Sequence, residues 1–206
     1  GFLAAYLKLP ALAVTMAMAN IVQGIVNAYT KGADITGKPS PILQIIAAKS
    51  TGIFPNVVFL LIVVAIITMI LLYKTSWGLK LFGVGSNEVA AYLSGVDAKI
   101  VRWVAFMVSG VLASLMGLLL IGNLGLAFKD MGSIYVMPSI AATVVGGISL
   151  DGGEGNYFNV ILGSIFLQTL TNLLIALGWG DAGKWIGFGI VLYVLLIAYV
   201  RNPRSR

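Results

Sequence analysis

Hydrophobic residues in this chain are grouped into long uncharged runs, and short polar segments separate the runs. A membrane-spanning helix needs roughly 20 mainly apolar residues. Six runs of about that length lack Asp, Glu, Lys and Arg, namely 11–29, 56–73, 103–122, 134–148, 157–177 and 185–200. The fourth run is the shortest, but counting the loops on alternate sides of a membrane favours a full span there. The pattern predicts an all-α fold: a polytopic transmembrane helix bundle with about six spanning segments.

Composition supports a membrane protein and narrows its chemistry. Hydrophobic residues make up 59% of the chain, charged residues make up 10%, and the mean hydropathy is +1.00. The chain contains no Cys and no His, so disulfides, thiolate nucleophiles, imidazole bases and most transition-metal sites are ruled out within it. We therefore expect no catalytic residue, no metal site, no cofactor and no enzymatic activity.

The basic residues indicate how the chain is oriented. The net charge is +6, but Lys and Arg do not form the stripe that a nucleic-acid partner requires. If all six runs cross the membrane, the segment 74–102 and the C-terminal tail lie on the same side of it. That side then carries eight of the thirteen basic residues, including those of the segment and the tail. Because cytoplasmic loops carry an excess of Lys and Arg, this predicts a multi-pass protein of a bacterial-type inner membrane, with its C-terminus in the cytoplasm.

The polar segment 74–102 has the features of a short capped helix. Asn87 is a good N-cap, Glu88 suits the first turn, and Gly95 is a typical stop. The spacing predicts about two turns over 88–94, with Val89 and Leu93 on one face. Two interpretations follow: a helix that lies on the lipid headgroups, or a helix that docks in a groove of another protein.

At this point the chain resembles a known family. The stretch "SNEVAAYLSG" is similar to the cytoplasmic loop of permease subunits of ATP-binding-cassette importers for ribose and related monosaccharides, a family shared with branched-chain amino acid permeases. The stretches "KLPALAVTMAMANIVQGI" and "PSIAATVVGGISLDGGEG" also resemble that family. One departure concerns the acid: in the family it directly precedes the two alanines, whereas here Val89 holds that place and Glu88 comes one residue earlier.

The resemblance implies a function and a set of partners. It implies that 1–206 is a single permease domain that lacks the N-terminal part of the subunit, consistent with a start at Gly1 rather than Met, and that 74–102 is its coupling loop. It also implies a sugar importer whose partners are an ATP-binding cassette subunit that hydrolyses ATP, a second permease copy and a periplasmic or lipid-anchored sugar-binding protein. The residues that would couple to the ATPase are Asn87, Glu88, Ala90, Ala91, Ser94 and Gly95. Uptake of nucleosides or branched-chain amino acids is an alternative within this class, and a secondary transporter or channel for a small polar solute is an alternative outside it.

Two stripes of polar residues run along expected spans. Asn20, Gln23 and Asn27 share one face of the first span with Gly24, and Gln168 and Asn172 share a face of the fifth with Ser164 and Thr171. Such residues face the inside of a bundle and not lipid. Two interpretations apply to both stripes: hydrogen bonds between helices, or a path for sugar hydroxyl groups.

Two loops carry further expectations. The loop 30–55 contains "PILQIIAAK", which predicts a short amphipathic segment at the membrane interface or a landing surface for a binding protein. The glycine-rich segment 146–155 lacks the Lys and Ser/Thr of a phosphate-binding loop, so it is expected to break a helix at the cytoplasmic surface.

Overall fold

A computed structural model describes the chain apart from residues 1, 7–10, 33–36, 48–54, 150–151 and 201–206. The described residues are mainly helical, and an isolated antiparallel bridge pairs Gly37 with Ala127. The chain forms two compact units, Gly1–Met131 and Gly132–Arg206. The single permease domain expected over 1–206 stays a prediction.

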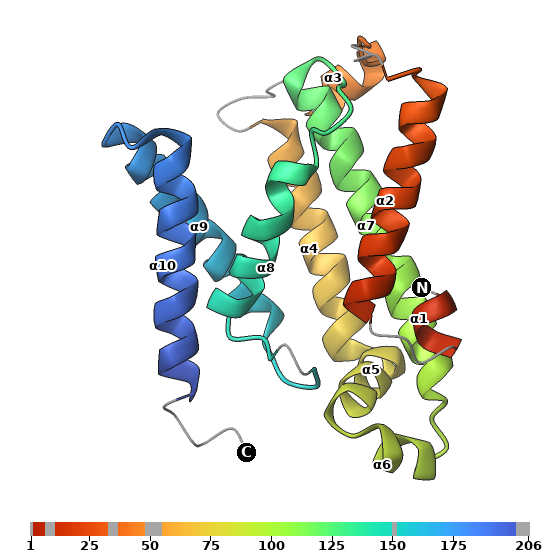
Figure 1. The fold of residues 1–206 in the computed structure, drawn as a ribbon. Helices are drawn as coiled ribbons and strands as arrows, with labels where there is room; N and C mark the ends of the chain where they lie inside the picture. The colour runs from red at the N-terminus through yellow and green to blue at the C-terminus, as the bar shows by residue number, and fades with distance from the viewer. Residues whose placement is uncertain (1, 7–10, 33–36, 48–54, 150–151, 201–206) are drawn as a thin grey trace. The chain divides into compact units, whose positions relative to one another are not determined.

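The first unit contains three long helices that run in alternating directions (Figure 1). These are α2 (Ala11–Tyr29), α4 (Asn56–Lys74) and α7 (Ala98–Leu124). The short helices α1 (Phe2–Tyr6), α5 (Ser76–Ser86) and α6 (Glu88–Leu93) lie at one end of the unit, which we call the α6 end. Helix α3 (Pro41–Ala47) lies at the opposite end, the α3 end. The predicted segment in the loop 30–55 is therefore helical, although residues 33–36 and 48–54 of that loop lie outside the described part.

Close backbone contacts hold α3 against α7. A Cβ added to Gly122 would lie 2.6 Å from the Leu43 carbonyl oxygen and 2.7 Å from the Cβ of Ala47, so only glycine lets the two helices come this near. Ala47 is fully buried at this contact. The Asn56 side chain at the start of α4 donates a hydrogen bond of 3.2 Å to the carbonyl oxygen of Ile45. The α3 helix is thus fixed to α7 and α4.

The second unit contains η1 (Ser133–Tyr135), α8 (Val136–Val145), α9 (Tyr157–Ala176) and α10 (Gly180–Val200). Its core is formed by Ala141, Ala142 and Leu167, with Phe188 of α10 packed against them. Two glycines allow α8 and α9 to cross closely, because a Cβ on Gly163 would lie 2.7 Å from the Ala142 carbonyl oxygen and one on Gly146 would lie 2.7 Å from the Val160 Cα. The glycine-rich segment does end a helix, as predicted, at Gly146.

Three of the six predicted spans are confirmed as helices long and apolar enough to cross a membrane. Among the described residues these are Asn56–Lys74, Ala98–Leu124 and Tyr157–Ala176. The first and last runs also form long helices, α2 and α10. The full span predicted over 134–148 is not confirmed, because α8 has 10 residues and is about 15 Å long, half the roughly 30 Å of a hydrocarbon core. The helix ends early because Gly146 begins the turn into the glycine-rich segment.

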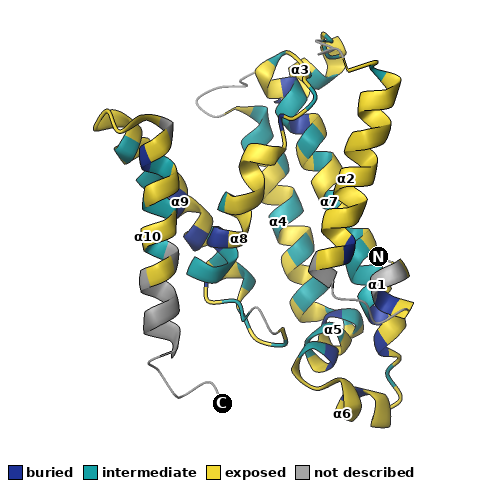
Figure 2. Ribbon diagram, viewed as in Figure 1, coloured by how far each residue is buried: buried dark blue, intermediate teal, exposed yellow. Residues whose placement is uncertain are grey.

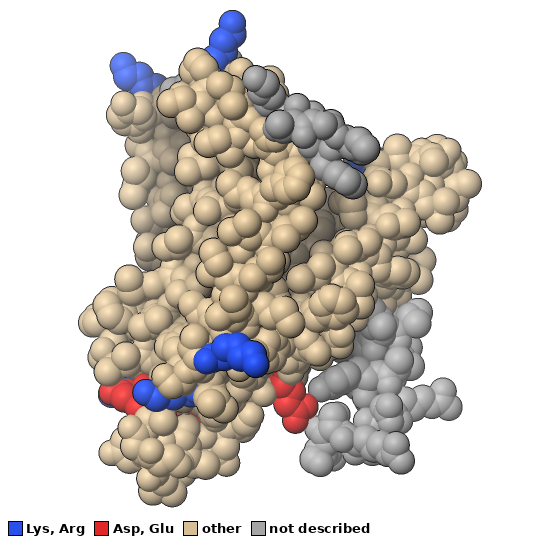
Figure 3. Space-filling model, turned by 180° about the vertical axis from the view of Figure 1, so that it is seen from behind, with Lys and Arg blue, Asp and Glu red and all other residues tan. Residues whose placement is uncertain are grey.

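Large hydrophobic side chains are exposed along the long helices, which is the reverse of a soluble fold (Figure 2). Most of the surface drawn in Figure 3 is uncharged, and the few charged side chains on that face lie in small separate groups. Continuous exposed apolar surface of this extent indicates contact with lipid or with other protein.

Candidate functional site

The loop 74–102 contains α5, α6 and the first residues of α7, which pack against one another at the α6 end. Side chains from α5, α6 and α7 meet in a small core of Val84, Ala91, Ala98 and Val101. Thr75 begins α5 by accepting a hydrogen bond from the Gly78 N–H, and Asp97 begins α7 by accepting one of 2.9 Å from the Lys99 N–H. Helix α6 is therefore held against both of its neighbours.

Both ends of α6 are capped as the sequence predicts. The Asn87 side chain accepts a hydrogen bond of 3.0 Å from the Ala90 N–H, which satisfies one free donor of the first turn. At the other end Gly95 has φ +81, the Gly95 N–H donates to the Tyr92 carbonyl, and the Val96 N–H donates to the Ala91 carbonyl. These bonds form a Schellman motif, and Val96 packs on the core that contains Ala91, which is the hydrophobic contact that accompanies such motifs.

An ion pair joins α6 to α7. The Glu88 carboxylate lies 2.6 Å from the Arg102 guanidinium, and both side chains are about half-exposed. This contact connects the first turn of α6 with the second turn of α7. Glu88 therefore faces α7 in the structure.

The outer face of α6 is apolar and exposed. Val89, Tyr92 and Leu93 are 69%, 73% and 80% exposed, and we call them the α6 apolar face. Val89 and Leu93 were predicted to share this face, whereas Tyr92 was missed although its i+3 spacing from Val89 gives the same result. Exposed apolar patches of this kind are typical of surfaces that contact another protein or a membrane.

The structure separates the predicted coupling residues by role. Ala91 is buried in the core of the loop, so it supports α6 and does not lie on the outer surface. Asn87, Ala90, Ser94 and Gly95 are exposed, and the Ser94 hydroxyl donates a hydrogen bond of 3.0 Å to the Ala90 carbonyl.

The polar stripe of α2 is exposed and meets a carboxylate. Asn20, Gln23 and Asn27 are all exposed, and the Gln23 side-chain amide donates a hydrogen bond of 2.5 Å to the carboxylate of Asp130. Asp130 belongs to the connection that follows α7 and is 107 residues away along the chain. The sequence alone does not indicate that Asp130 lies near the first span, since only the fold brings the two together.

The polar stripe of α9 forms hydrogen bonds within its own helix. The Gln168 amide donates a hydrogen bond of 3.3 Å to the Asn172 side chain one turn later. The hydroxyls of Thr171 and Ser164 donate to the carbonyls of Leu167 and Ile161. This stripe lies in the second unit and that of α2 in the first. Within the described residues, no group of three or more His, Cys, Asp or Glu side chains is placed so that it could hold a metal ion.

The helices and the capped loop define a polytopic α-helical membrane protein with a short helix held outside its spans. Comparison with known proteins gives the family: the pattern described as branched-chain amino acid transport system / permease component matches residues 1–200. The chain belongs to this permease family.

The relatives of the chain are import permeases. It is 34% identical to the autoinducer 2 import system permease protein LsrC of Shigella flexneri over 202 residues, which are 96% of this chain and 57% of that protein. It is also 34% identical to LsrC of Salmonella typhimurium over 88% of this chain and 53% of that protein, and 33% identical to LsrC of Escherichia coli O157:H7 over 96% and 57%. The chain thus spans little more than half the length of these relatives. No solved structure matches it.

Proposed function

We propose that this chain is part of the permease subunit of an ATP-driven importer for a monosaccharide or similar polyhydroxylated solute. The observation that carries the proposal is α6, a helix capped at both ends whose apolar face points away from the rest of its loop. Membership of a transport permease family supports it, and so does similarity to proteins named as permeases of an autoinducer 2 import system.

In this proposal α6 is the coupling helix. Its apolar face, formed by Val89, Tyr92 and Leu93, docks in a cleft of an ATP-binding cassette subunit, as an amphipathic helix lies in a groove. The core around Ala91 and the ion pair between Glu88 and Arg102 join α6 to α7. Because α7 has 27 residues, a movement imposed on α6 passes directly into a helix long enough to cross the membrane.

The proposal includes the topology and the remaining partners. The α6 end faces the cytoplasm, because most basic residues of the chain lie on that side if the runs alternate. About six segments cross the inner membrane, with the C-terminus in the cytoplasm. A second permease copy completes the translocation path, a periplasmic or lipid-anchored binding protein delivers the solute, and ATP is hydrolysed on the cassette subunit.

The docking role of α6 is tested in the full-length permease reconstituted with its cassette subunit. The change Leu93→Ser removes most of an exposed apolar side chain and leaves the capping bonds of α6 in place. We expect solute-stimulated ATP hydrolysis and uptake to fall at least tenfold, while membrane insertion and thermal stability stay unchanged. Loss of a buried contact in the centre of an interface has effects of this size.

A matched control lies on the neighbouring helix. Leu79 of α5 is 76% exposed, close to the 80% of Leu93, so Leu79→Ser removes the same side chain from a comparable surface. We expect this variant to retain coupling. Equal loss in the two variants would contradict the assignment to α6. Uptake that runs on an ion gradient in the absence of ATP would instead favour a secondary transporter.

A further inference from the structure

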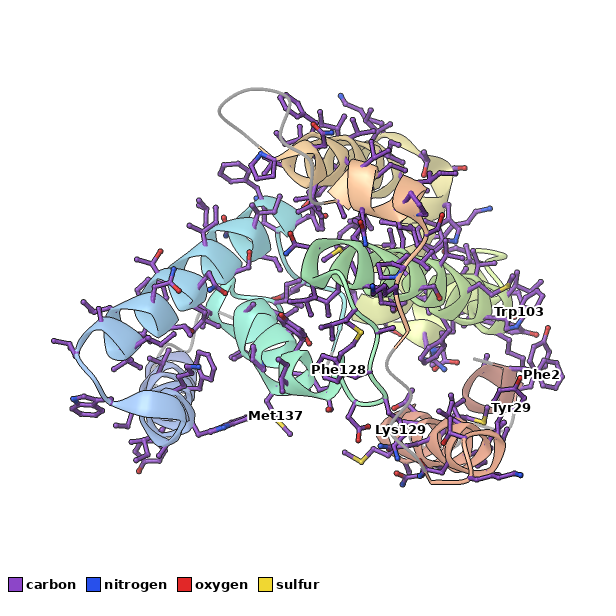
Figure 4. All side chains as sticks on the ribbon, turned by 90° about the horizontal axis from the view of Figure 1, so that it is seen from above. Phe2, Tyr29, Trp103, Phe128, Lys129 and Met137 are labelled. Carbon is purple, nitrogen blue, oxygen red and sulfur yellow. The ribbon has the colours of Figure 1, made fainter. Side chains whose placement is uncertain are left out.

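The connection after α7 is held in a defined place beside α2. It begins at Gly125, which has φ +71 and ends α7. Ala127 then pairs with Gly37 through two backbone hydrogen bonds of 3.0 and 3.3 Å, and Met131 is buried. Figure 4, seen from the α3 end, shows Lys129 of this connection beside α2, whose last residue Tyr29 is also labelled. Asp130 thus lies between a residue held by backbone pairing, Ala127, and a residue with a buried side chain, Met131.

Asp130 meets α2 within the helix and not at its end. Its partner Gln23 lies six residues before Tyr29, the last residue of α2, which is about 9 Å along a helix. Lys31 is the first charged residue beyond α2, and the helix itself has none. Because a carboxylate is costly to place in hydrocarbon, this side of α2 faces a polar region and not lipid.

The contact also orients the whole polar stripe. Asn20 and Asn27 lie three residues before and four residues after Gln23, so they share its face of α2. Gly24 lies next to Gln23 on this face, and a Cβ added there would meet nothing within 4 Å. A carboxylate, three amides and open space therefore lie along the second half of α2, the half toward the α3 end.

We infer that Asp130 and Gln23 form a solute-contact site that binds vicinal hydroxyl groups of a polyhydroxylated solute at the outer end of the translocation path. This inference rests on the proposed function for the class of solute. A carboxylate offers about four lone-pair positions, so it can accept hydrogen bonds from two neighbouring hydroxyls in addition to its bonds within the protein, which include that from Gln23. Amide groups both donate and accept, and Asn20 and Asn27 extend the site along α2 in steps of about one turn.

Cysteine protection tests the site without knowledge of the natural solute. These 206 residues contain no cysteine, so Gly24→Cys places a unique thiol beside Gln23 once any cysteine elsewhere in the full-length protein has been replaced. The rate of labelling by a hydrophilic maleimide is measured with D-ribose, D-xylose, D-glucose, ribitol or L-leucine present. We expect at least one polyhydroxylated probe to slow labelling severalfold, and leucine to have no effect. A cysteine that replaces the exposed Lys38 should be labelled at one rate throughout.

The role of the carboxylate is tested in the same assay. In Asp130→Asn the concentration that gives half-protection should rise about tenfold or more, because hydrogen bonds to a charged group are the stronger ones. The asparagine can still accept the Gln23 hydrogen bond, so the connection stays in place. Gln23→Met, which removes the amide at similar size, should weaken protection as well. The matched control is Lys129→Gln, which neutralises the neighbouring charge and should leave protection unchanged.

Several results would overturn the site. These are a thiol at position 24 that no polyhydroxylated probe protects, protection by leucine equal to that by the sugars, or identical half-protection concentrations with Asp and Asn at position 130. The site and the proposed function fail separately. ATP-driven sugar uptake without protection of the thiol in the Gly24→Cys variant refutes the site alone, whereas protection without ATP-driven uptake refutes the importer alone.

Discussion

The ion pair between Glu88 and Arg102 leads to a quantitative prediction about the loop 74–102. The two charged groups are 2.6 Å apart, but their side chains are 45% and 38% exposed. Solvent screens a pair of this kind, so its interaction contributes about 0.2–1 kcal/mol and not the several kcal/mol of a buried pair. Glu88 is also the acidic residue in the first turn of α6, where a negative charge adds about 0.3–1 kcal/mol at the positive end of the helix.

The perturbation is a double-mutant cycle of Glu88→Gln and Arg102→Gln in the full-length protein. Glu88→Gln removes both contributions, Arg102→Gln removes only the pair, and the double variant loses the pair once. Hydrogen exchange of the amides in α6 measures the result, because local opening of the helix sets their protection. We expect Arg102→Gln alone to speed exchange about 1.4- to 5-fold, which is 0.2–1 kcal/mol, and the double variant to exchange no faster than Glu88→Gln.

A second basic residue provides the control for this cycle. Lys99 lies one turn before Arg102, and its ammonium group is 5.9 Å from the ring centre of Tyr6. Glu88→Gln and Lys99→Gln should therefore have additive effects on exchange. Additive effects of Glu88→Gln and Arg102→Gln would refute the pair. Slower ATP hydrolysis in Glu88→Gln with unchanged exchange would place the carboxylate in the interface with the cassette subunit.

Glycine substitutions test the packing of the helices, with Gly117→Ala of α7 as the common control because a Cβ there meets nothing within 4 Å. Gly122→Ala should push α3 away from α7 and lower the midpoint of thermal unfolding, whereas Gly117→Ala should leave it unchanged or raise it through better helix propensity. Gly163→Ala should lower the same midpoint by separating α8 from α9. Gly95→Ala should cost about 1–2 kcal/mol, because φ +81 is strained for a residue with a Cβ, and should speed exchange of the last α6 amides about 5- to 30-fold. Equal midpoints for Gly117→Ala and Gly122→Ala would contradict the close contact with α3.

The structure of the loop 74–102 could be predicted in detail because it depends on local interactions. An N-cap acts on residues two or three positions away, and a Schellman motif needs only a glycine after the last turn. The identities of Asn87 and Gly95 were therefore sufficient to set both ends of α6. Whether the Ala91 side chain faces outward or into the core was not predictable, since alanine fits an exposed face and a small core equally well. Contacts of α6 with α5 and α7 decide between the two.

The contact between Gln23 and Asp130, by contrast, could not be predicted from the sequence. Sequence alone gives a polar stripe on α2 and an acidic residue in a loop after α7, and no local rule connects residues 107 positions apart. The fold makes the connection by ending α7 at Gly125 and pairing Ala127 with Gly37. The six uncharged runs contain no Asp, Glu, Lys or Arg of their own. Tertiary structure nevertheless brings the Asp130 carboxylate to α2.

The length of α8 and the non-helical backbone before it bear on whether the run 134–148 crosses the membrane. Helices η1 and α8 together cover about 21 Å, which is too short to cross a hydrocarbon core of about 30 Å. If this part of the chain crosses, the non-helical connection that begins at Gly125 has to supply the remaining depth. Irregular backbone at membrane depth is tolerated only where protein buries it or where it lines a water-filled cavity. Transporters use such broken spans to form their solute sites. Asp130 lies in this connection, within the first unit, and contacts α2 about 9 Å before the end of that helix, so irregular backbone reaches the depth of a long apolar helix there.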